Sequence, residues 1–224
     1  MSDYYKNNLS SERLLRVYET APSRIRQYLK AEVDFVVGRI KPGDKVLELG
    51  CGYGRVLPDL VGKSGMAVGI DTSLESLRFG RETVPSTGNC FLLNMNATQL
   101  GFADGSFDLV ACIQNGISAF HVDKRALLAE SIRVTKRGGT VVFSSYSDKF
   151  WKHRLEWFRL QSELGLLGEI DEEKTGDGVI VCKDGFTATT IGPAEFRALA
   201  EELDVDCRIT EVDNSSLFCE IEVP

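Results

Sequence analysis

A glycine-rich turn that directly follows a short, mostly apolar run constrains the fold of this chain more than any other feature of its sequence. The run covers residues 46–49, which are apolar except for Glu48, and glycine follows at positions 50, 52 and 54. A run of this length is typical of a buried strand, and the glycines permit a tight turn whose backbone N–H groups can approach a ligand closely. The feature predicts a strand, a ligand-binding turn and a helix, the unit from which doubly wound α/β sheets are built.

The following segments repeat this alternation of short apolar runs with helical spacing. Strands are expected at residues 45–49, 66–70, 89–94, 107–113 and 139–145, with helices at 55–62, 73–83 and 123–136. Such alternation indicates an α/β fold with a parallel, doubly wound sheet. Two helices over residues 9–40, broken near Pro22, precede the first strand.

Residues 146–192 break the alternation, and we interpret them as an insertion after the fifth strand. They begin with an aromatic-rich helix and continue into a stretch that contains several Gly and Asp residues. Helical spacing resumes at Pro193, and strands at 205–212 and 216–223 can form an antiparallel hairpin at the edge of the sheet.

The length of the chain favours one domain, because 224 residues can bury a single sizeable core. We expect four parts within it: a helical N-terminal lid (1–40), a cofactor-binding core (41–145), a lid insertion (146–192), and a closing helix with an edge hairpin (193–224).

The spacing of the glycines bears on the ligand. A dinucleotide fingerprint, G-x-G-x-x-G, would need glycine where this chain has Arg55. Glu48 stands two residues before the first glycine, where an acid would serve a pyrophosphate poorly. A carboxylate at that place suits a cationic ligand, such as the ammonium group of a methionine moiety.

A second acid, Asp71, ends the strand expected after the glycine turn, about 20 residues further along the chain. A carboxylate there can accept hydrogen bonds from both hydroxyls of a ribose. Both NAD and S-adenosylmethionine contain that ribose, so an NAD-dependent oxidoreductase stays an alternative at this point. The plain structural explanation, a cap for the helix that follows Thr72, accounts for Asp71 alone but not for its separation from the glycine turn.

The combination resembles the class I S-adenosylmethionine-dependent methyltransferases over roughly residues 40–145. Glu48 with its three glycines looks like the first motif of that family, and Asp71 looks like the acid of the second. Residues 96–102 and 104–110 are similar to the family's D-A-x-x-L-P-F and D-x-S-F-D-x-V runs. The resemblance implies a seven-stranded sheet whose last strand is antiparallel.

The resemblance also implies a set of cofactor contacts. They fall on Glu48, Gly50, Cys51, Gly52, Gly54, Asp71, Thr72, Met95, Asn96, Ala97 and Gln114. In the family an Asp at position 96 contacts the adenine amino group. Here the residue is Asn96, whose amide oxygen can still accept from that group.

Methyl transfer from a sulfonium to an N, O or S atom is a direct displacement that leaves S-adenosylhomocysteine. It requires an acceptor atom within about 3 Å of the methyl carbon and the exclusion of water, but no obligatory catalytic motif. A non-catalytic protein that only binds the cofactor is therefore a second alternative. Asn115 and His121 follow the expected fourth strand and are the candidates for a catalytic role, although an exposed histidine is common.

Small-molecule methyltransferases of this type build lids at the N-terminus and after the fifth strand. The residues that we expect there, or beside the acceptor, are Tyr18, Tyr28, Asn115, Trp151 and Trp157. Aromatic residues on a helix face more often belong to the core, and that explanation stays open for each of them.

The composition limits the kinds of molecule that this chain is expected to bind. A net charge of −7 disfavours nucleic acid, which needs a basic face. No apolar stretch approaches the roughly 20 residues that span a bilayer, and the N-terminus lacks the pattern of a signal peptide. Six scattered cysteines, two histidines and no C-x-x-C pair argue against a metal site. We expect a cytoplasmic protein with a small-molecule substrate and neither a metal nor a membrane.

Overall fold

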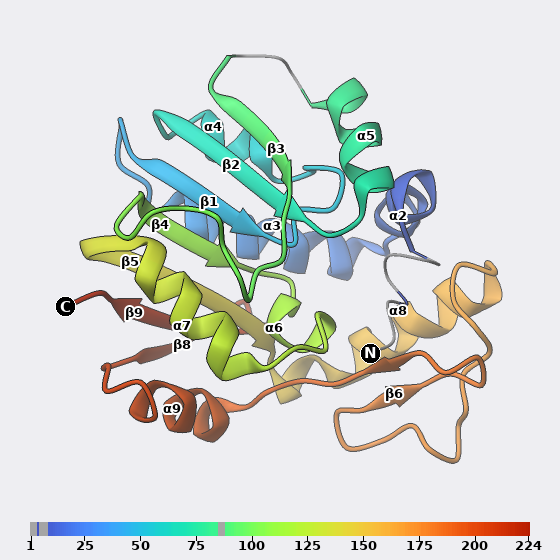
Figure 1. The fold of residues 1–224 in the computed structure, drawn as a ribbon. Coiled ribbons are helices and arrows are strands. Elements are labelled where there is room, and N and C mark those ends of the chain that lie inside the picture. The colour runs from blue at the N-terminus through green and yellow to red at the C-terminus, as the bar shows by residue number, and fades with distance from the viewer. Residues whose placement is uncertain (1–3, 5–8, 85–87) are drawn as a thin grey trace.

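The computed structural model describes residues 4, 9–84 and 88–224, so the first residues of the expected N-terminal lid, 1–3 and 5–8, lie outside it. Its centre is a seven-stranded sheet with the strand order β3-β2-β1-β4-β5-β9-β8 (Figure 1). The strands are β1 (Lys45–Leu49), β2 (Met66–Asp71), β3 (Cys90–Asn94), β4 (Phe107–Cys112), β5 (Thr135–Tyr146), β8 (Arg208–Val212) and β9 (Ser216–Glu222). The first five are parallel, and β9 runs antiparallel to both β5 and β8. The predicted doubly wound sheet with an antiparallel last strand is confirmed.

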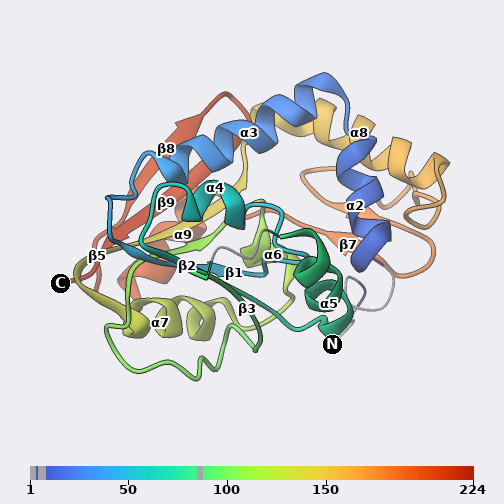
Figure 2. The same ribbon diagram turned by 90° about the horizontal axis from the view of Figure 1, so that it is seen from above.

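Helices cover both faces of this sheet (Figures 1 and 2). They are α2 (Ser11–Glu19), α3 (Ser23–Val37), α4 (Leu57–Val61), α5 (Leu74–Thr83), α6 (Gly116–Ala119), α7 (Lys124–Val134), α8 (Trp151–Glu163) and α9 (Pro193–Glu201). Side chains just before two of these helices cap their first turns. Ser73 caps α5 by accepting from the Ser76 N–H, and Asp123 caps α7 by accepting from the Ala126 N–H.

Two apolar layers explain why the strands are apolar on both sides, as parallel strands usually are. Val46 packs with Val36 of α3 and Leu60 of α4 on one face. Its neighbour Leu47 packs on the other face, in a cluster that includes Leu128 of α7. Successive residues of a strand point to opposite faces, so the central strands β1 and β4 bury almost every side chain.

The structure differs from the sequence expectations around the fifth strand. The helix expected at 123–136 ends at Val134, and β5 begins at Thr135 rather than at residue 139. The pairing of β5 with β4 shifts register between Phe107 and Leu109, as at a β-bulge, and Gly138 takes a φ of 71° there. The bulge lets the strand pass through the Gly138–Gly139 pair that looks like a turn in the sequence.

The N-terminal helices and the insertion share a third apolar cluster. It joins α2, α3 and α8 to a short antiparallel pair, β6 (Ile180–Val181) with β7 (Thr187–Ala188). α8 lies beside α3, and α2 packs against α5 (Figure 2). Arg13 of α2 donates from Nη2 to the Gly165 carbonyl at 2.5 Å, just beyond the end of α8. None of the described helices is both long and apolar enough to cross a membrane.

Candidate cofactor and acceptor site

A cavity of about 420 Å³ lies where the carboxyl ends of the parallel strands meet α2, α3 and α8. Ligands of doubly wound sheets bind at this end of the strands. One end of the cavity is lined by the turns that follow β1, β2 and β3. The other is lined by aromatic and aliphatic side chains of the N-terminal helices and the insertion.

The glycine turn is held in a conformation that requires glycine. Gly50, Gly52 and Gly54 have φ values of +73°, +57° and +80°. The N–H groups of Gly50 and Cys51 both donate to the Ile70 carbonyl, at 2.8 and 2.9 Å, which fixes the turn to the end of β2. A Cβ at position 50 would lie 2.4 Å from the Phe120 ring, so this ring lies directly against the turn.

Asp71 connects the second motif to the first. Its Oδ2 accepts from the Gly52 N–H at 2.9 Å, and its Oδ1 accepts from the Ser73 N–H at 2.7 Å. Burial raises the pKa of Asp71, and these backbone hydrogen bonds oppose the rise. An ionised carboxylate has about four acceptor positions, so both oxygens can still take a hydroxyl. The arrangement suits a ribose diol.

Glu48 carries an unsatisfied acceptor at the bottom of the cavity. The residue is 5% exposed, and its Oε2 is buried without a hydrogen-bond partner. Burial raises the pKa of Glu48 to about 7; the Asp71 charge adds to the rise and the Arg55 charge opposes it. A buried acceptor without a donor costs about 1–3 kcal/mol, which a donor on a ligand would offset. The residues present therefore fit the ammonium group and the ribose of S-adenosylmethionine.

The turn after β3 lines the same end of the cavity with Met95, Asn96 and Ala97. Asn96 is exposed, and its Oδ1 accepts from both the N–H and the hydroxyl of Thr98 at 3.0 Å. Its amide oxygen thus already has two donors. The adenine contact expected of Asn96 stays a prediction.

The end of β4 is held by an acid that sequence reasoning missed. Gln114 and Asn115 follow β4 with φ values of 56° and 62°, a conformation that non-glycine residues seldom adopt. The Gln114 N–H donates to Oε2 of Glu32 at 2.6 Å, and the same oxygen accepts from the Ser144 hydroxyl at 2.9 Å. Glu32 is fully buried on α3, and burial raises its pKa to about 7. Its signal in the sequence is an acid on the apolar face of the helix at 23–37.

The structure brings most of the expected site residues to the cavity. The cofactor candidates that line it are Glu48, Gly50, Cys51, Gly52, Asp71, Thr72, Met95, Asn96, Ala97 and Gln114. Gly54 does not: a Cβ there would meet Val84 and Leu57, so its role is close packing. Tyr18, Tyr28 and Trp157 line the other end.

Three candidates lie away from the cavity. Both polar atoms of the Asn115 side chain are engaged, since Nδ2 donates to the Thr189 carbonyl and Oδ1 accepts from the Ser145 hydroxyl, each at 2.9 Å. His121 is exposed and has a φ of 51°. Trp151 lines a separate hollow with Asp148 and Arg154. The geometry thus gives Asn115 a structural role, tying the insertion to β5, and places neither His121 nor Trp151 in the lining of this cavity.

Other lining residues were not predicted as site residues, although Arg55 follows the glycine turn and Phe158 belongs to the aromatic-rich helix of the insertion. Arg55, Phe120, Tyr146, Phe158 and Phe186 all face the cavity. They reach it from the α4 turn, the turn after α6, β5, α8 and the β6–β7 loop, and only tertiary packing brings these segments together. The residues that the structure describes contain no group of three His, Cys, Asp or Glu side chains that could hold a metal ion.

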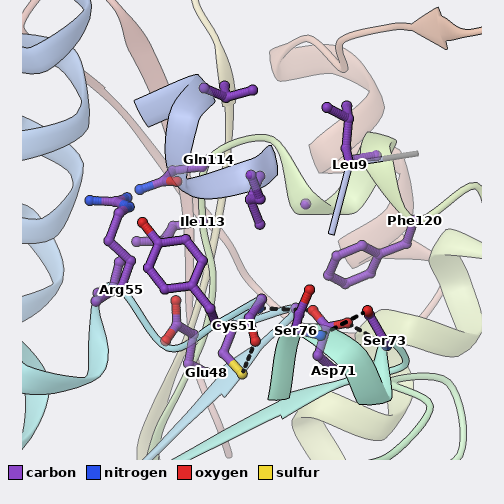
Figure 3. Close-up of a pocket in the computed structure, with 18 of the residues that line it drawn as sticks. Leu9, Glu48, Cys51, Arg55, Asp71, Ser73, Ser76, Ile113, Gln114 and Phe120 are labelled. Carbon is purple, nitrogen blue, oxygen red and sulfur yellow. Dashed lines mark hydrogen bonds between the residues drawn. The ribbon is translucent and has the colours of Figure 1, made fainter. Parts of the chain in front are cut away.

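In Figure 3, Glu48, Arg55 and Gln114 lie on one side of the cavity, and Asp71, Ser73 and Phe120 lie on the other. Glu48, which suits the ammonium group, and Asp71, which suits the ribose, thus lie on opposite sides of the cavity. Arg55 and Gln114 both contact Tyr18, an aromatic residue of the other end: Arg55 lies over its ring, and Gln114 accepts from its hydroxyl.

Comparisons with known proteins agree with this geometry. Residues 46–139, from β1 into β5, match a family described as a methyltransferase domain. The demethylmenaquinone methyltransferase of Geobacillus stearothermophilus is 32% identical over 178 residues, a match that covers 71% of this chain and 74% of that protein. The arsenite methyltransferase of Aquipseudomonas alcaligenes is 36% identical over 123 residues, 48% of this chain but only 34% of that protein.

A solved structure from Pyrococcus horikoshii OT3 has the same fold, with a TM-score of 0.66, 22% identity and 100% of each chain covered. The cavity at the strand ends, the family match and the similarity along most of a curated relative agree with one another. This chain belongs to the S-adenosylmethionine-dependent methyltransferases and is an enzyme of that family.

Proposed function

We propose that this enzyme transfers the methyl group of S-adenosylmethionine to a small organic acceptor by direct displacement. The observation that carries the proposal is a single cavity with two chemically different ends. One end offers acids and glycine backbone to a cationic nucleotide. The other is enclosed by aromatic and aliphatic side chains and has room only for a small molecule.

The residues of the cofactor end have separate tasks. Glu48 receives the ammonium group, Asp71 the ribose hydroxyls, and the segment from Met95 to Ala97 borders the adenine. When bound, the cofactor supplies an electrophilic methyl group and its own leaving group. The chain then has to hold the acceptor in line with that methyl group and keep water away from it.

We propose that residues 1–40 and 146–192 form the lid over the acceptor. Two contacts support a joint lid. The Arg13 side chain bonds to the carbonyls of Gly165 and Leu166, and the Tyr4 hydroxyl donates to Asp184 at 2.5 Å. These bonds tie the N-terminal helices to the insertion across more than 150 residues of sequence.

The names of the relatives support a small acceptor, because demethylmenaquinone and arsenite are both small molecules. The net charge of −7 supports the same choice over nucleic acid. Among the described cysteines only Cys51 lines the cavity, and burial raises the pKa of its thiol well above the usual range. A set of converging thiolates, which arsenite would favour, is not seen among these residues.

The test begins with cofactor binding, by calorimetric titration with S-adenosylhomocysteine and, separately, with NADH. We expect only the first to bind. Methyl-labelled S-adenosylmethionine is then incubated with the enzyme and a fractionated cell extract, and we expect label in the small-molecule fraction. Label confined to nucleic acid or protein would overturn the small-acceptor proposal, and binding of NADH alone would overturn the cofactor assignment.

A further inference from the structure

The acceptor end of the cavity is apolar on nearly every side. Its walls come from α2, α3, α8 and the ends of β5 and the β6–β7 loop, and its aromatic members are Tyr18, Tyr28, Tyr146, Trp157, Phe158 and Phe186. Glu48 and Asp71, the acids that line the cavity, belong to the cofactor end. The remaining charged side chain among the described lining residues is Arg55.

The Arg55 guanidinium lacks a carboxylate partner. It lies over the Tyr18 ring, 4.4 Å from the centroid, and no carboxylate of the described residues comes within ion-pair distance of it. Its Nη2 is buried and has no hydrogen-bond partner. Arg55 lowers the pKa of Glu48 through its charge, but it does so without a direct contact. Arg55 therefore places a positive charge, with an N–H donor that has no partner, at the border of an apolar chamber.

Two more unsatisfied donors belong to residues that line the same chamber. The Oε1 of Gln114 accepts from the Tyr18 hydroxyl at 3.2 Å, while its Nε2 is buried without a partner. Tyr18 thus lies against both Arg55 and Gln114, and Figure 3 shows these two side chains on the same side of the cavity. Trp157 is 5% exposed, lines the chamber, and leaves its Nε1 without a partner.

The unsatisfied side-chain atoms here include two acceptors, Glu48 Oε2 in the cavity and Glu32 Oε1 beside Gln114, and three donors. Arg55 Nη2, Gln114 Nε2 and Trp157 Nε1 are all donors, and a buried donor without an acceptor is uncommon in folded proteins. An amine would be repelled by Arg55, and the two nearby acids already have roles, Glu48 at the cofactor end and Glu32 in accepting from the Gln114 N–H. A neutral ring would leave the guanidinium unpaired. A group with two acceptor oxygens and a negative charge satisfies Arg55 and Gln114 together.

We propose that the methyl acceptor is an aromatic or similarly flat apolar carboxylate, with the carboxylate against Arg55 and Gln114 and the apolar body between the aromatic walls. This inference rests on the proposed function, since it names the acceptor class of the same cavity. It assigns Arg55 as the residue that sets acceptor specificity. A planar guanidinium matches a carboxylate through two parallel hydrogen bonds, which a phenolate with its single oxygen cannot supply.

The experiment measures binding to the full chain saturated with S-adenosylhomocysteine. The probes are benzoate and 2-naphthoate, each compared with its own carboxamide, together with phenol and 2-naphthol. We expect at least one carboxylate to bind about tenfold or more tightly than its amide, because a charge-assisted pair is lost in the amide. In Arg55→Gln the ratio of the two affinities should fall to within about twofold of one.

Arg16→Gln is the matched control, because it makes the same charge change on an exposed face of α2 and should keep the wild-type ratio. Trp157→Phe keeps an aromatic ring and removes the Nε1 donor, so it should lower the affinity for the carboxylate more than that for the amide. Using a ratio at saturating cofactor separates the acceptor effect from any change in cofactor affinity.

Equal affinities of carboxylate and amide in the wild type would overturn the inference, as would a preference that persists in Arg55→Gln, tighter binding of the phenols, or no binding of either carboxylate at millimolar concentration. In each of these outcomes the proposed function survives provided that S-adenosylhomocysteine binds and label is transferred to some other small molecule. Failure of S-adenosylhomocysteine to bind would instead remove the proposed function itself.

Discussion

Glu48 is the side chain whose chemistry depends most directly on its surroundings. A glutamate in water ionises well below neutral pH, but burial in the cavity raises the pKa of Glu48 to about 7. The carboxyl is therefore poised to gain or lose its proton near neutrality. That property leads to two predictions, one on ligand binding and one on stability.

For binding, Glu48→Gln should weaken S-adenosylhomocysteine about ten- to a hundredfold at pH 8, because a charged partner of the ammonium group is replaced by a neutral amide. Wild-type affinity should also fall as the pH drops below about 7, where Glu48 is protonated, whereas the variant should lose this dependence. Calorimetry at pH 6 and pH 8 measures both. Glu82→Gln, an exposed change of the same kind on α5, is the control, and equal losses in the two variants would contradict the assignment.

For stability, the direction of the pH effect depends on whether the folded or the unfolded chain holds the Glu48 proton more tightly. The folded, cofactor-free chain keeps the Glu48 proton up to about pH 7, while the unfolded chain releases it near 4.5. Between these values the folded chain binds more protons, so Glu48 lowers the free energy of unfolding as the pH rises. Relative to Glu48→Gln, the wild type should lose about 2 kcal/mol between pH 5 and pH 7.5. Urea unfolding at both pH values checks this, and a pH-independent difference between the two proteins would refute it.

At the scale of elements, Arg13 connects α2 to the end of α8, the two helices that we propose as parts of the lid. Arg13 donates to the Gly165 carbonyl and, from Nε and Nη2, to the Leu166 carbonyl. Carbonyls beyond a helix C-terminus have no partner within the helix, and an arginine is a suitable donor for them. α2 also packs against α5, where the Ser11 N–H donates to the Ser76 hydroxyl, and its Tyr18 hydroxyl donates to Gln114; the Arg13 bonds add to these contacts.

Arg13→Gln should raise the rate of amide exchange in α2 about five- to tenfold, because each lost hydrogen bond contributes about 1 kcal/mol to local stability. Arg16→Gln, on the exposed face of the same helix, should leave that rate unchanged. Hydrogen–deuterium exchange resolved by peptide measures both variants. Equal protection in Arg13→Gln and Arg16→Gln would mean that the bonds from Arg13 do not stabilise α2.

At the scale of the whole molecule, the buried apolar residues form three separate clusters. Two of them flank the sheet and contain no residue from before α3. The third holds the N-terminal helices and the insertion together over the cavity. The sheet and its covering helices can therefore remain folded when the outermost part of the third cluster is lost.

Removing residues 1–20 should abolish methyl transfer and leave a cooperatively folded core. The deletion takes away Leu9, Leu14, Val17 and Tyr18, which line the cavity, and so opens it to water. Turnover of labelled cofactor and thermal unfolding followed by circular dichroism measure the two effects. Unchanged turnover in a folded protein would show that these residues form no lid.

Much of this fold was predictable because the signals are local. The alternation of apolar runs places β1 and β2 within a residue of their observed bounds, since a buried strand must be apolar on both faces. The sequence did not predict α6, because a helix of one turn is too short to show a helical periodicity. The start of β5 was misplaced because a bulge at Gly138 looks like a turn when its partner strand is unknown.

By itself the sequence determined the fold class and pointed to the strand-end residues that we assign to the cofactor. The glycine turn, Glu48 and Asp71 act through the backbone and through positions close to a strand end, which motif spacing records. Only the tertiary structure decided the acceptor end. Glu32 reaches Gln114 across 82 residues and Tyr18 reaches it across 96, and no local pattern encodes a contact at such a separation. These side chains meet because the burial of the apolar faces of α2, α3 and α8 drives those helices together, and the polar groups carried on them then converge on one cavity.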